Sequence, residues 1–343
     1  MKMNTRAMML TSSAAIAAVA LTACSGSSAQ PTAEGQPVTI QVGFENTADE
    51  PIGQAVQHWA ELLEEHSDGE ITLELFPSSA LGSKSELIDQ MVLGENIITI
   101  ADGAFYADYG VPDMGIMYGP FFFDTWEDVW ALLDSDWYAE QSGLLDEKGL
   151  TLLTSNWVYG ERHLMTNSSV LTPDDLRGQK IRLANAKIYI EGFAALGATP
   201  VGMDLSDVYS SLQSGVIDGV ENPLSTLYGG SFQEVSKNVL LTGHIKNFTT
   251  WVAGSTFMDT LTDEQQQLLY DTAEEAGLYN NQLQEKADVE YRQLLEDAGV
   301  TITELTDEQR AEWADAGKSF YEMGDTFGWS DDLYEVTREA MGK

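Results

Sequence analysis

Strand-like and helix-like hydrophobic patterns alternate along the chain from Val38 onward. Val38–Phe44 reads V-T-I-Q-V-G-F, an alternation rich in β-branched residues that predicts a strand. Across Pro51–His66, apolar residues recur every three or four positions with acids between them, which predicts an amphipathic helix. Strands at Ile71–Phe76 and Asn96–Ala101 and a helix at Lys84–Leu93 are predicted next. This order indicates an α/β sheet covered by helices.

The second half of the chain adds one unusually long helical segment. From Thr262 to Ala298, apolar residues keep a helical spacing, with a break expected only near Gly277. At about 1.5 Å per residue the segment reaches about 55 Å, so we expect a long helix or a kinked pair that packs across two lobes. Other helices are predicted at Trp126–Leu133, Tyr228–Leu241 and Asp307–Met323. Strands are predicted at Thr151–Trp157, Thr250–Gly254 and Val300–Leu305.

The stretch between Leu176 and Asn222 holds a cation in an unusual place. A strand predicted at Lys180–Leu183 carries Arg182 between apolar neighbours, whose side chains face the other way by strand alternation. Arg182 therefore points at something other than the apolar layer of the sheet. A helix is predicted at Asp204–Ser214, and the short strand after it ends in Glu221-Asn222-Pro223.

Two further places bear on a ligand site. Asp102 and Phe105 follow the third predicted strand, at the carboxyl end where open α/β sheets place ligands. Gly160 indicates a crossing between two lobes, and Arg162 follows it. An arginine at a hinge is a candidate anion clamp, but a surface arginine that pairs with Glu161 or another nearby acid fits these residues equally well.

The N-terminus has the layout of an export signal. Residues 1–23 carry two cations and then an apolar run that is too short to span a bilayer comfortably. The L-T-A-C motif that ends at Cys24 resembles the bacterial lipobox, in which the cysteine is lipidated after cleavage; a plain signal with a chance cysteine is the alternative. Residues 24–37, rich in Ser, Gly, Gln and Pro, are expected to form a flexible tether. We therefore expect an exported protein, lipid-anchored at the outer face of the cytoplasmic membrane or in the periplasm.

Charge narrows the set of partners. The chain has 17 Lys and Arg against 55 Asp and Glu, a net charge of −38, and loss of residues 1–23 leaves 15 cations and −40. Such a charge repels polyanions, which excludes nucleic acid as a partner, and it is compatible with a saline habitat. An anion site in this chain must use one of very few arginines.

No catalytic motif is present in the sequence. There is no G-x-S-x-G, P-loop, G-x-G-x-x-G after a strand or H-E-x-x-H, and the four histidines have no partner at metal-ligand spacing. Adjacent acids such as Glu64-Glu65 are most simply solvated helix faces. We therefore expect no catalytic residue, no metal and no cofactor.

An ordered set of motifs resembles one family. G-Q-K-I-R-L-A-N, A-L-G-A-T-P-V-G-M and V-Y-S-S-L-Q-S-G-V-I-D-G-V-E-N-P, followed by Y-G-G-S-F-Q-E-V and L-T-G-H, resemble the dicarboxylate-binding type of substrate-binding protein of tripartite ATP-independent periplasmic (TRAP) transporters. The resemblance covers essentially the whole mature chain and implies a two-lobed, periplasmic-binding-protein-like α/β fold. Each lobe is then a sheet covered by helices, with 38–159 plus 248–286 as lobe I and 160–247 plus 287–343 as lobe II.

The resemblance also implies residue roles. The arginine of the G-x-K-x-R strand, which pairs with the ligand carboxylate in the family, maps to Arg182, and the assisting arginine after the hinge maps to Arg162. The asparagine of the E-N-P turn maps to Asn222, and the polar residue after the third strand maps to Asp102. Some members that bind sugar acids have asparagine near the end of the first strand, where this chain has Glu45-Asn46, so the contact of Glu45 stays open.

A carboxylate between closing lobes would suit a guanidinium fork, with aromatic residues on the apolar faces of the ligand. The residues expected in these roles are Phe105, Trp157, Tyr159, Tyr189 and Trp251, with Asn185 and Asn222 reading hydroxyls. We thus expect a monomeric, non-enzymatic lipoprotein that captures a sugar acid, a uronate or a C4-dicarboxylate and delivers it to the TRAP membrane subunits. An exported enzyme acting on an organic acid and a lipoprotein scaffold are the alternatives.

Overall fold

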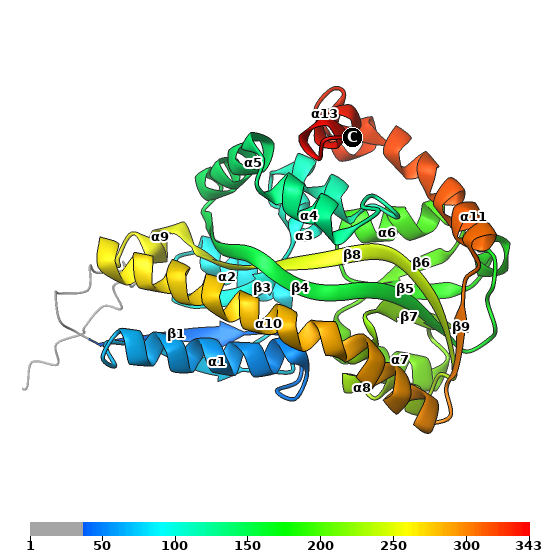
Figure 1. Cartoon of the computed structure of the whole chain (residues 1–343), viewed down its shortest axis with the longest axis horizontal. Helices are drawn as coiled ribbons and strands as arrows, with labels where there is room; N and C mark the ends of the chain where they lie inside the picture. The colour runs from blue at the N-terminus through cyan, green and yellow to red at the C-terminus, as the bar shows by residue number, and fades with distance from the viewer. Residues whose placement is uncertain (1–36) are drawn as a thin grey trace, which may run out of the picture.

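One continuous sheet runs through both lobes of the molecule. The computed structural model describes residues 37–343 and contains a nine-stranded sheet of order β2-β1-β3-β8-β4-β7-β5-β6, with β9 paired to β8 (Figure 1). The strands are β1 Val38–Gly43, β2 Ile71–Phe76, β3 Ile97–Ala101, β4 Leu150–Thr166, β5 Lys180–Leu183, β6 Thr199–Gly202, β7 Gly219–Asn222, β8 Asn238–Gly254 and β9 Thr301–Glu304. The first three strands are parallel to one another, as are β5, β6 and β7.

Strands β4 and β8 join the two lobes. Each has 17 residues, and they pair antiparallel from Leu150 opposite Gly254 to Thr166 opposite Asn238. One end of β8 pairs with β3, whereas the far end of β4 pairs with β7. Gly160 lies inside β4 with φ +131°, and a Cβ there would come 2.8 Å from Cβ of Pro223. The strand predicted at Thr151–Trp157 is thus part of a longer strand that continues, with bulges, through the expected crossing point.

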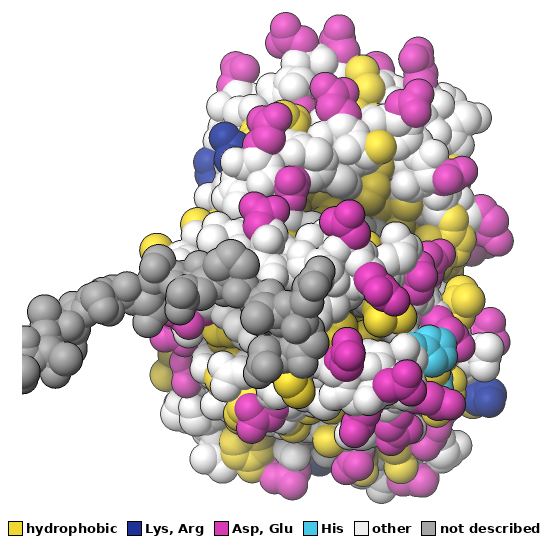
Figure 2. Space-filling model, turned by 90° about the vertical axis from the view of Figure 1, so that its left-hand side faces the viewer, with side chains coloured by type: hydrophobic (Ala, Val, Ile, Leu, Met, Phe, Trp, Pro, Cys, Tyr) yellow, Lys and Arg dark blue, Asp and Glu magenta, His cyan; other side chains and the backbone are white. Residues whose placement is uncertain are grey.

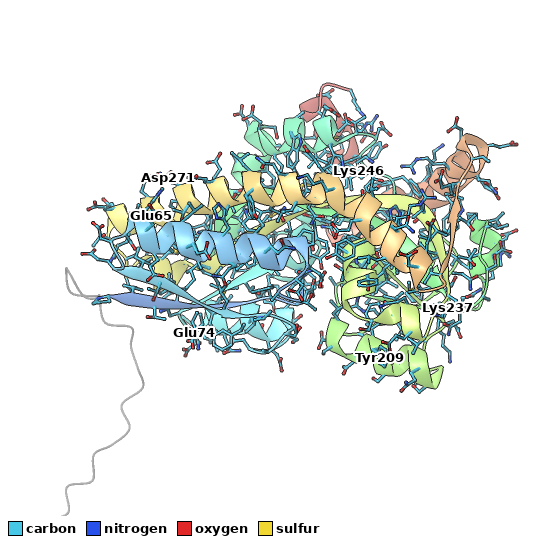
Figure 3. All side chains as sticks on the ribbon, turned by 60° about the horizontal axis from the view of Figure 1, so that its bottom comes forward. Glu65, Glu74, Tyr209, Lys237, Lys246 and Asp271 are labelled. Atoms are coloured by element: carbon cyan, nitrogen blue, oxygen red, sulfur yellow. The ribbon has the colours of Figure 1, made fainter. Side chains whose placement is uncertain are left out.

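A single long helix spans both lobes, as the sequence predicted. Helix α10, Asp263–Asp297, has 35 residues and lies against α1 of one lobe and α8 of the other (Figures 1 and 3). The predicted break near Gly277 is wrong, because the helix is continuous there. A Cβ on Gly277 would lie 2.1 Å from Oδ1 of Asn156, so this glycine allows α10 to approach β4 closely.

Helices cover both faces of the sheet. Besides α10 they are α1 Pro51–His66, α2 Lys84–Val92, α3 Gly103–Asp108, α4 Trp126–Leu133, α5 Asp136–Glu147, α6 Lys187–Ala195, α7 Val208–Ser214, α8 Leu224–Gly229, α9 Ser255–Met258, α11 Asp307–Gly317, α12 Gly324–Phe327 and α13 Leu333–Ala340. The helix predicted from Tyr228 is wrong, since α8 ends at Gly229 and the next long element is β8. The helix predicted at Asp307–Met323 ends at Gly317 and continues as a 3-10 turn.

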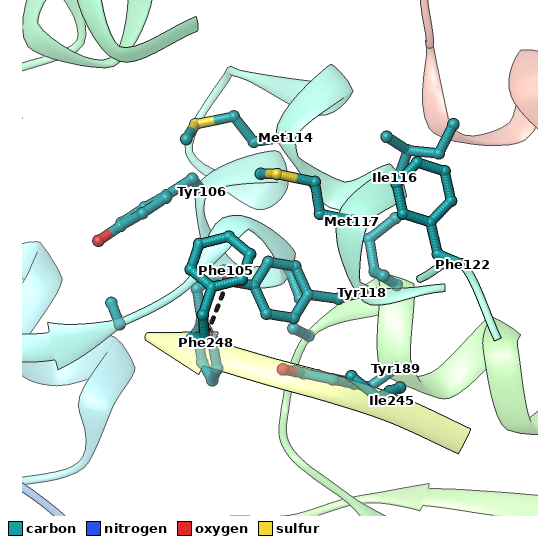
Figure 4. Close-up of a cluster of buried hydrophobic side chains, with 14 of the residues drawn as sticks. Phe105, Tyr106, Met114, Ile116, Met117, Tyr118, Phe122, Tyr189, Ile245 and Phe248 are labelled. Carbon is teal, nitrogen blue, oxygen red and sulfur yellow. Dashed lines mark hydrogen bonds between the residues drawn. The ribbon is translucent and has the colours of Figure 1, made fainter. Parts of the chain in front are cut away.

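The core consists of apolar clusters on either side of the sheet. In one of them Trp59, Trp157 and Trp251 are fully buried, with ring centroids 5.3 to 6.4 Å apart. Another includes Phe105, Tyr118 and Phe248, which Figure 4 shows packed together. Edge and tilted contacts of this kind stabilise aromatic pairs beyond the burial of their surface.

The surface carries the excess of acids. Figure 2 shows one face, on which Asp and Glu side chains are spread widely and Lys and Arg are few. Within residues 37–343, no helix combines the length and the apolar character that a membrane crossing needs. The predicted signal peptide, Cys24 and the tether lie outside the described residues, save Pro37 at the end of the tether.

Candidate functional site: a closed pocket between the lobes

A small cavity of about 10 Å³, about the space that one water molecule needs, lies where the two lobes meet. Its walls come from residues at or just after the carboxyl ends of parallel strands β1, β3, β5 and β7, from the β4 and β8 ribbon, and from the first turns of nearby helices. This edge of an open α/β sheet is where ligands bind. The lining residues are Glu45, Lys84, Asp102, Phe105, Tyr159, Arg162, Arg182, Ala184, Tyr189, Asn222, Asn247 and Thr249.

Arg182 presents an unpaired guanidinium fork to this pocket. Its side chain is buried, with the residue 2% exposed, and its Nε donates to the backbone oxygen of Met203 at 2.8 Å. Within residues 37–343, neither terminal nitrogen makes a hydrogen bond or an ion pair, which leaves four N–H donors. Burial lowers the pKa of Arg182, but an arginine remains protonated at neutral pH. A buried, charged donor pair without an acceptor is a site for an anion.

Arg162 also reaches the pocket, but its charge is already paired. It is 4% exposed; its Nε and Nη2 donate to the two carboxylate oxygens of Glu221 at 2.5 and 2.6 Å, and its Nη1 donates to Oδ1 of Asn247 at 2.8 Å. With a further bond from Nη2 to the Glu221 backbone oxygen, a single N–H on Nη1 remains for a ligand. The alternative of a surface arginine paired with Glu161 is wrong, since Glu161 pairs with Lys246 at 2.5 Å.

Glu221 is the buried counter-ion of this arrangement. Burial alone would raise the pKa of Glu221, but the Arg162 guanidinium outweighs it and lowers the pKa to about 2. Nε2 of His244 lies 3.2 Å from the same carboxylate. Burial lowers the pKa of His244, so the ring is neutral near pH 7 and its Nε2–H donates a hydrogen bond to the Glu221 carboxylate.

Glu45 and Lys84 form a second ion pair at the pocket wall. Nζ of Lys84 donates to Oε1 of Glu45 at 3.1 Å and lies 4.6 Å from the centroid of the Phe105 ring. The Tyr159 hydroxyl donates to the same Oε1 at 3.1 Å, and Oε2 accepts no hydrogen bond from residues 37–343. Burial opposes ionisation of Glu45, but Lys84 and then Arg182 outweigh it and lower its pKa.

Asp102 joins two segments of the pocket wall, the start of α3 and helix α6. Its Oδ1 caps α3 by accepting from the Ala104 backbone N–H at 3.0 Å, and its Oδ2 accepts from the Tyr189 hydroxyl at 3.0 Å. Burial raises the pKa of Asp102. Nearby, the side chain of Asn222 lines the pocket and makes no hydrogen bond within the described part of the chain.

Three residues predicted from the sequence lie elsewhere. Trp157 is fully buried and donates from its indole to the Ala273 backbone oxygen of α10 at 2.9 Å, and Trp251 packs beside it. Bulges on both sides of Trp157 interrupt the alternation of β4, so Tyr159 lines the pocket and Trp157 does not. Asn185 is exposed beside Gly202. Neither tryptophan nor Asn185 is placed to cover or read a ligand.

The pocket also contains residues that sequence reasoning missed. Lys84 begins α2 next to the capping box formed by Ser83 and Glu86, and the scarcity of cations in the chain was the available signal for it. Asn247 and Thr249 lie on either side of Phe248 in the H-I-K-N-F-T-T segment of β8. No group of three His, Cys, Asp or Glu side chains within residues 37–343 is arranged to hold a metal ion.

Comparison with known proteins gives one consistent result. The family model for bacterial extracellular solute-binding protein, family 7, matches residues 42–325. A 2,3-diketo-L-gulonate-binding periplasmic protein of Escherichia coli K12 is 31% identical over 280 residues, which cover 81% of this chain and 84% of that protein.

Two solved structures are similar over nearly the same span. A TRAP periplasmic solute-binding protein from Ochrobacterium anthropi with bound L-fuconate is 38% identical, with a TM-score of 0.85, and the match covers 89% of this chain and 99% of that one. A second, from Actinobacillus succinogenes 130Z with bound L-galactonate, is 37% identical, with a TM-score of 0.83 and the same coverage.

Proposed function

Because the chain belongs to the bacterial extracellular solute-binding proteins of family 7, we propose that it captures a small organic carboxylate between its lobes for a TRAP transporter. The observation that carries the proposal is the free fork of Arg182. A carboxylate that enters the pocket loses water, and two parallel N–H bonds from Arg182 replace that water. We expect the remaining N–H of Arg162 and the amide of Asn222, which also line the pocket, to assist.

Closure of the two lobes explains how the ligand is held. On the proposed boundaries, with 38–159 and 248–286 as lobe I, the Tyr189 to Asp102 bond crosses from one lobe to the other. Oγ1 of Thr226 likewise donates to Oε2 of Glu50 at 3.0 Å. These contacts exist only when the lobes meet, so a ligand that bridges the lobes favours this state.

The closed state is what we propose the membrane subunits recognise. A protein that only holds its ligand needs no nucleophile, base or metal, and the pocket residues are accounted for as carboxylate and hydroxyl contacts. A lipid on Cys24 with a tether to residue 37 would keep the protein beside these subunits at the outer face of the membrane.

Sugar acids are the ligands that we favour as first probes. L-Fuconate and L-galactonate, bound in the two similar structures, have the same configuration at every stereocentre and differ only at C6. The E. coli relative is named for another six-carbon sugar acid. The hydroxyl groups of such sugar acids could donate hydrogen bonds to the side-chain oxygens of Glu45, Asp102 and Asn222, which line this pocket.

Direct titration tests the proposal. L-Galactonate, L-fuconate, D-galacturonate and succinate, each at increasing concentration, are titrated into the mature protein by calorimetry, and the recovered acid is analysed for chemical change. We expect at least one acid to bind reversibly and unchanged, and its neutral amide to bind at least 100-fold more weakly. Absence of binding by every acid, or conversion of the acid to a product, contradicts the proposal.

A further inference from the structure

Three cations and three carboxyl groups meet at the pocket before any ligand enters. Three cations, Arg162, Arg182 and Lys84, face the pocket, and so do the carboxyl groups of Glu45 and Asp102, with Glu221 directly behind Arg162. Two of the cations are neutralised by contact, Arg162 by Glu221 and Lys84 by Glu45. Within residues 37–343, Arg182 is the pocket cation without an ion pair.

We propose that the pocket accepts one carboxylate and rejects a second one, so that its substrate class is the polyhydroxylated monocarboxylates rather than the dicarboxylates. This inference rests on the proposed function and narrows it. The carboxylate of the ligand pairs with Arg182, and the rest of the ligand presents hydroxyl groups to the opposite wall. Glu45 is the residue that we assign to excluding a second carboxylate.

The hydrogen-bonding inventory of the opposite wall supports this assignment. Oε2 of Glu45 accepts no hydrogen bond from the described residues, and each oxygen of Asp102 accepts only one. A ligand hydroxyl can donate to these oxygens, which satisfies both partners. A ligand carboxylate only accepts, so it would leave Oε2 of Glu45 facing a like charge without a donor between them.

Lys84 does not remove this conflict. Its ammonium is held between Oε1 of Glu45 and the face of the Phe105 ring. To pair with a second carboxylate, Lys84 would have to be shared with Glu45, which would bring two carboxylates onto one largely buried cation. Like charges at such a site disfavour each other strongly.

A matched pair of ligands tests the inference. Galactarate has the carbon skeleton and hydroxyl configuration of L-galactonate, with C6 oxidised to a second carboxylate, and D-glucarate is related to D-gluconate in the same way. We titrate both pairs, and succinate, into the wild-type protein at pH 7.5. For whichever aldonate binds, we expect the corresponding aldarate to bind at least 100-fold more weakly, and succinate to bind no more tightly than the aldarate.

Variants then locate the cause. Glu45→Gln removes the charge that repels the second carboxylate, and it also frees Lys84 to pair with that group. The ratio of aldonate affinity to aldarate affinity should therefore fall at least tenfold. Glu74→Gln makes the same change in charge on an exposed residue of β2 that is labelled in Figure 3, and should leave both affinities and their ratio unchanged. Thermal unfolding confirms that each variant is folded.

The outcomes separate this inference from the proposed function. If no acid binds, the proposed function itself is wrong. If an aldonate binds but its aldarate or succinate binds within tenfold of it, the protein is a carboxylate-binding protein and the charge argument is overturned. A Glu45→Gln protein that folds and keeps the wild-type ratio overturns the role of Glu45, because the discrimination would then come from elsewhere in the pocket.

Discussion

The guanidinium of Arg162 and the carboxylate of Glu221 form a two-pronged ion pair, with Nε to Oε2 at 2.5 Å and Nη2 to Oε1 at 2.6 Å. Both side chains are almost fully removed from solvent. The pair fixes Arg162 in the wall of the pocket and uses the fork that a ligand would otherwise occupy. The two arginines therefore differ: the fork of Arg162 is occupied by Glu221, whereas the terminal nitrogens of Arg182 make no hydrogen bond within residues 37–343.

Glu221→Gln should destabilise the protein mainly because it breaks the buried ion pair with Arg162. The substitution leaves the Arg162 charge buried without its partner, so we expect the free energy of unfolding at pH 7 to fall by about 3 to 5 kcal/mol. As a matched control, Glu304→Gln removes a carboxylate from the exposed pair with Arg292 and should cost less than about 1 kcal/mol. Urea denaturation of the two variants makes the comparison, and equal losses would contradict the structural role of Glu221.

The lowered pKa of Glu221 predicts that the stability of the folded protein depends on pH. Because the folded pKa of Glu221 is lowered to about 2 from an ordinary value of 4.5, its contribution to stability is fully present above pH 4.5. That contribution is lost as the pH falls from 4.5 towards 2, where the folded protein must take up the proton. Wild-type stability should therefore fall more steeply than that of Glu221→Gln over this range, measured by urea denaturation at fixed ionic strength. Parallel pH profiles would show that Glu221 is not the group involved.

Closure of the lobes can be tested through a single hydroxyl. Tyr189→Phe removes the bond to Asp102 that crosses the pocket, so we expect affinity for the confirmed acid to fall about fivefold to tenfold, since a net hydrogen bond of this kind contributes about 1 kcal/mol. Tyr118→Phe removes a buried bond to the Phe248 backbone oxygen, drawn as a dashed line in Figure 4, and should lower the free energy of unfolding by about 1 kcal/mol without changing affinity. Reversal of these two effects would refute the assignment of Tyr189.

Membrane anchoring is expected to depend on Cys24. Cys24→Ala should release the mature protein from the membrane fraction or stall its processing, because the lipid has no other attachment point in a chain with one cysteine. Ligand affinity should not change, since the described pocket contains no part of this segment. Fractionation and mass spectrometry of the N-terminus provide the measurement. Normal cleavage with unchanged membrane retention would exclude the lipobox.

Local patterns allowed much of the fold to be predicted, and tertiary contacts account for what was missed. The bounds of α1 and β2 match the predicted ones because their hydrophobic periods are clear. Gly277 was expected to break α10, but packing against Asn156 outweighs the small local cost of a glycine in a helix. The length of β4 was underestimated because its bulges destroy the alternation that reveals a strand.

At the candidate site, too, local patterns were predicted and tertiary contacts were not. Arg182 was identified from one arginine in an apolar strand, a purely local signal. Trp157 was misplaced because a bulge, which the sequence does not reveal, decides the face on which it lies. The partnership of Arg162 with Glu221 joins residues 59 positions apart on neighbouring strands, so no spacing rule predicts it.

Calorimetric titration of Arg182→Ala, Arg182→Lys and Arg177→Ala with one confirmed acid tests the central claim most directly. Arg182→Ala should weaken binding by about 3 to 5 kcal/mol, which is about 100-fold to several thousand-fold, and Arg182→Lys should recover only part of this because a point charge cannot replace the fork. Arg177 is exposed and pairs with Asp174, so its removal takes away the same charge outside the pocket and should change affinity by less than about 1 kcal/mol. If Arg177→Ala weakens binding as much as Arg182→Ala, the effect is long-range electrostatics and Arg182 is not the carboxylate clamp.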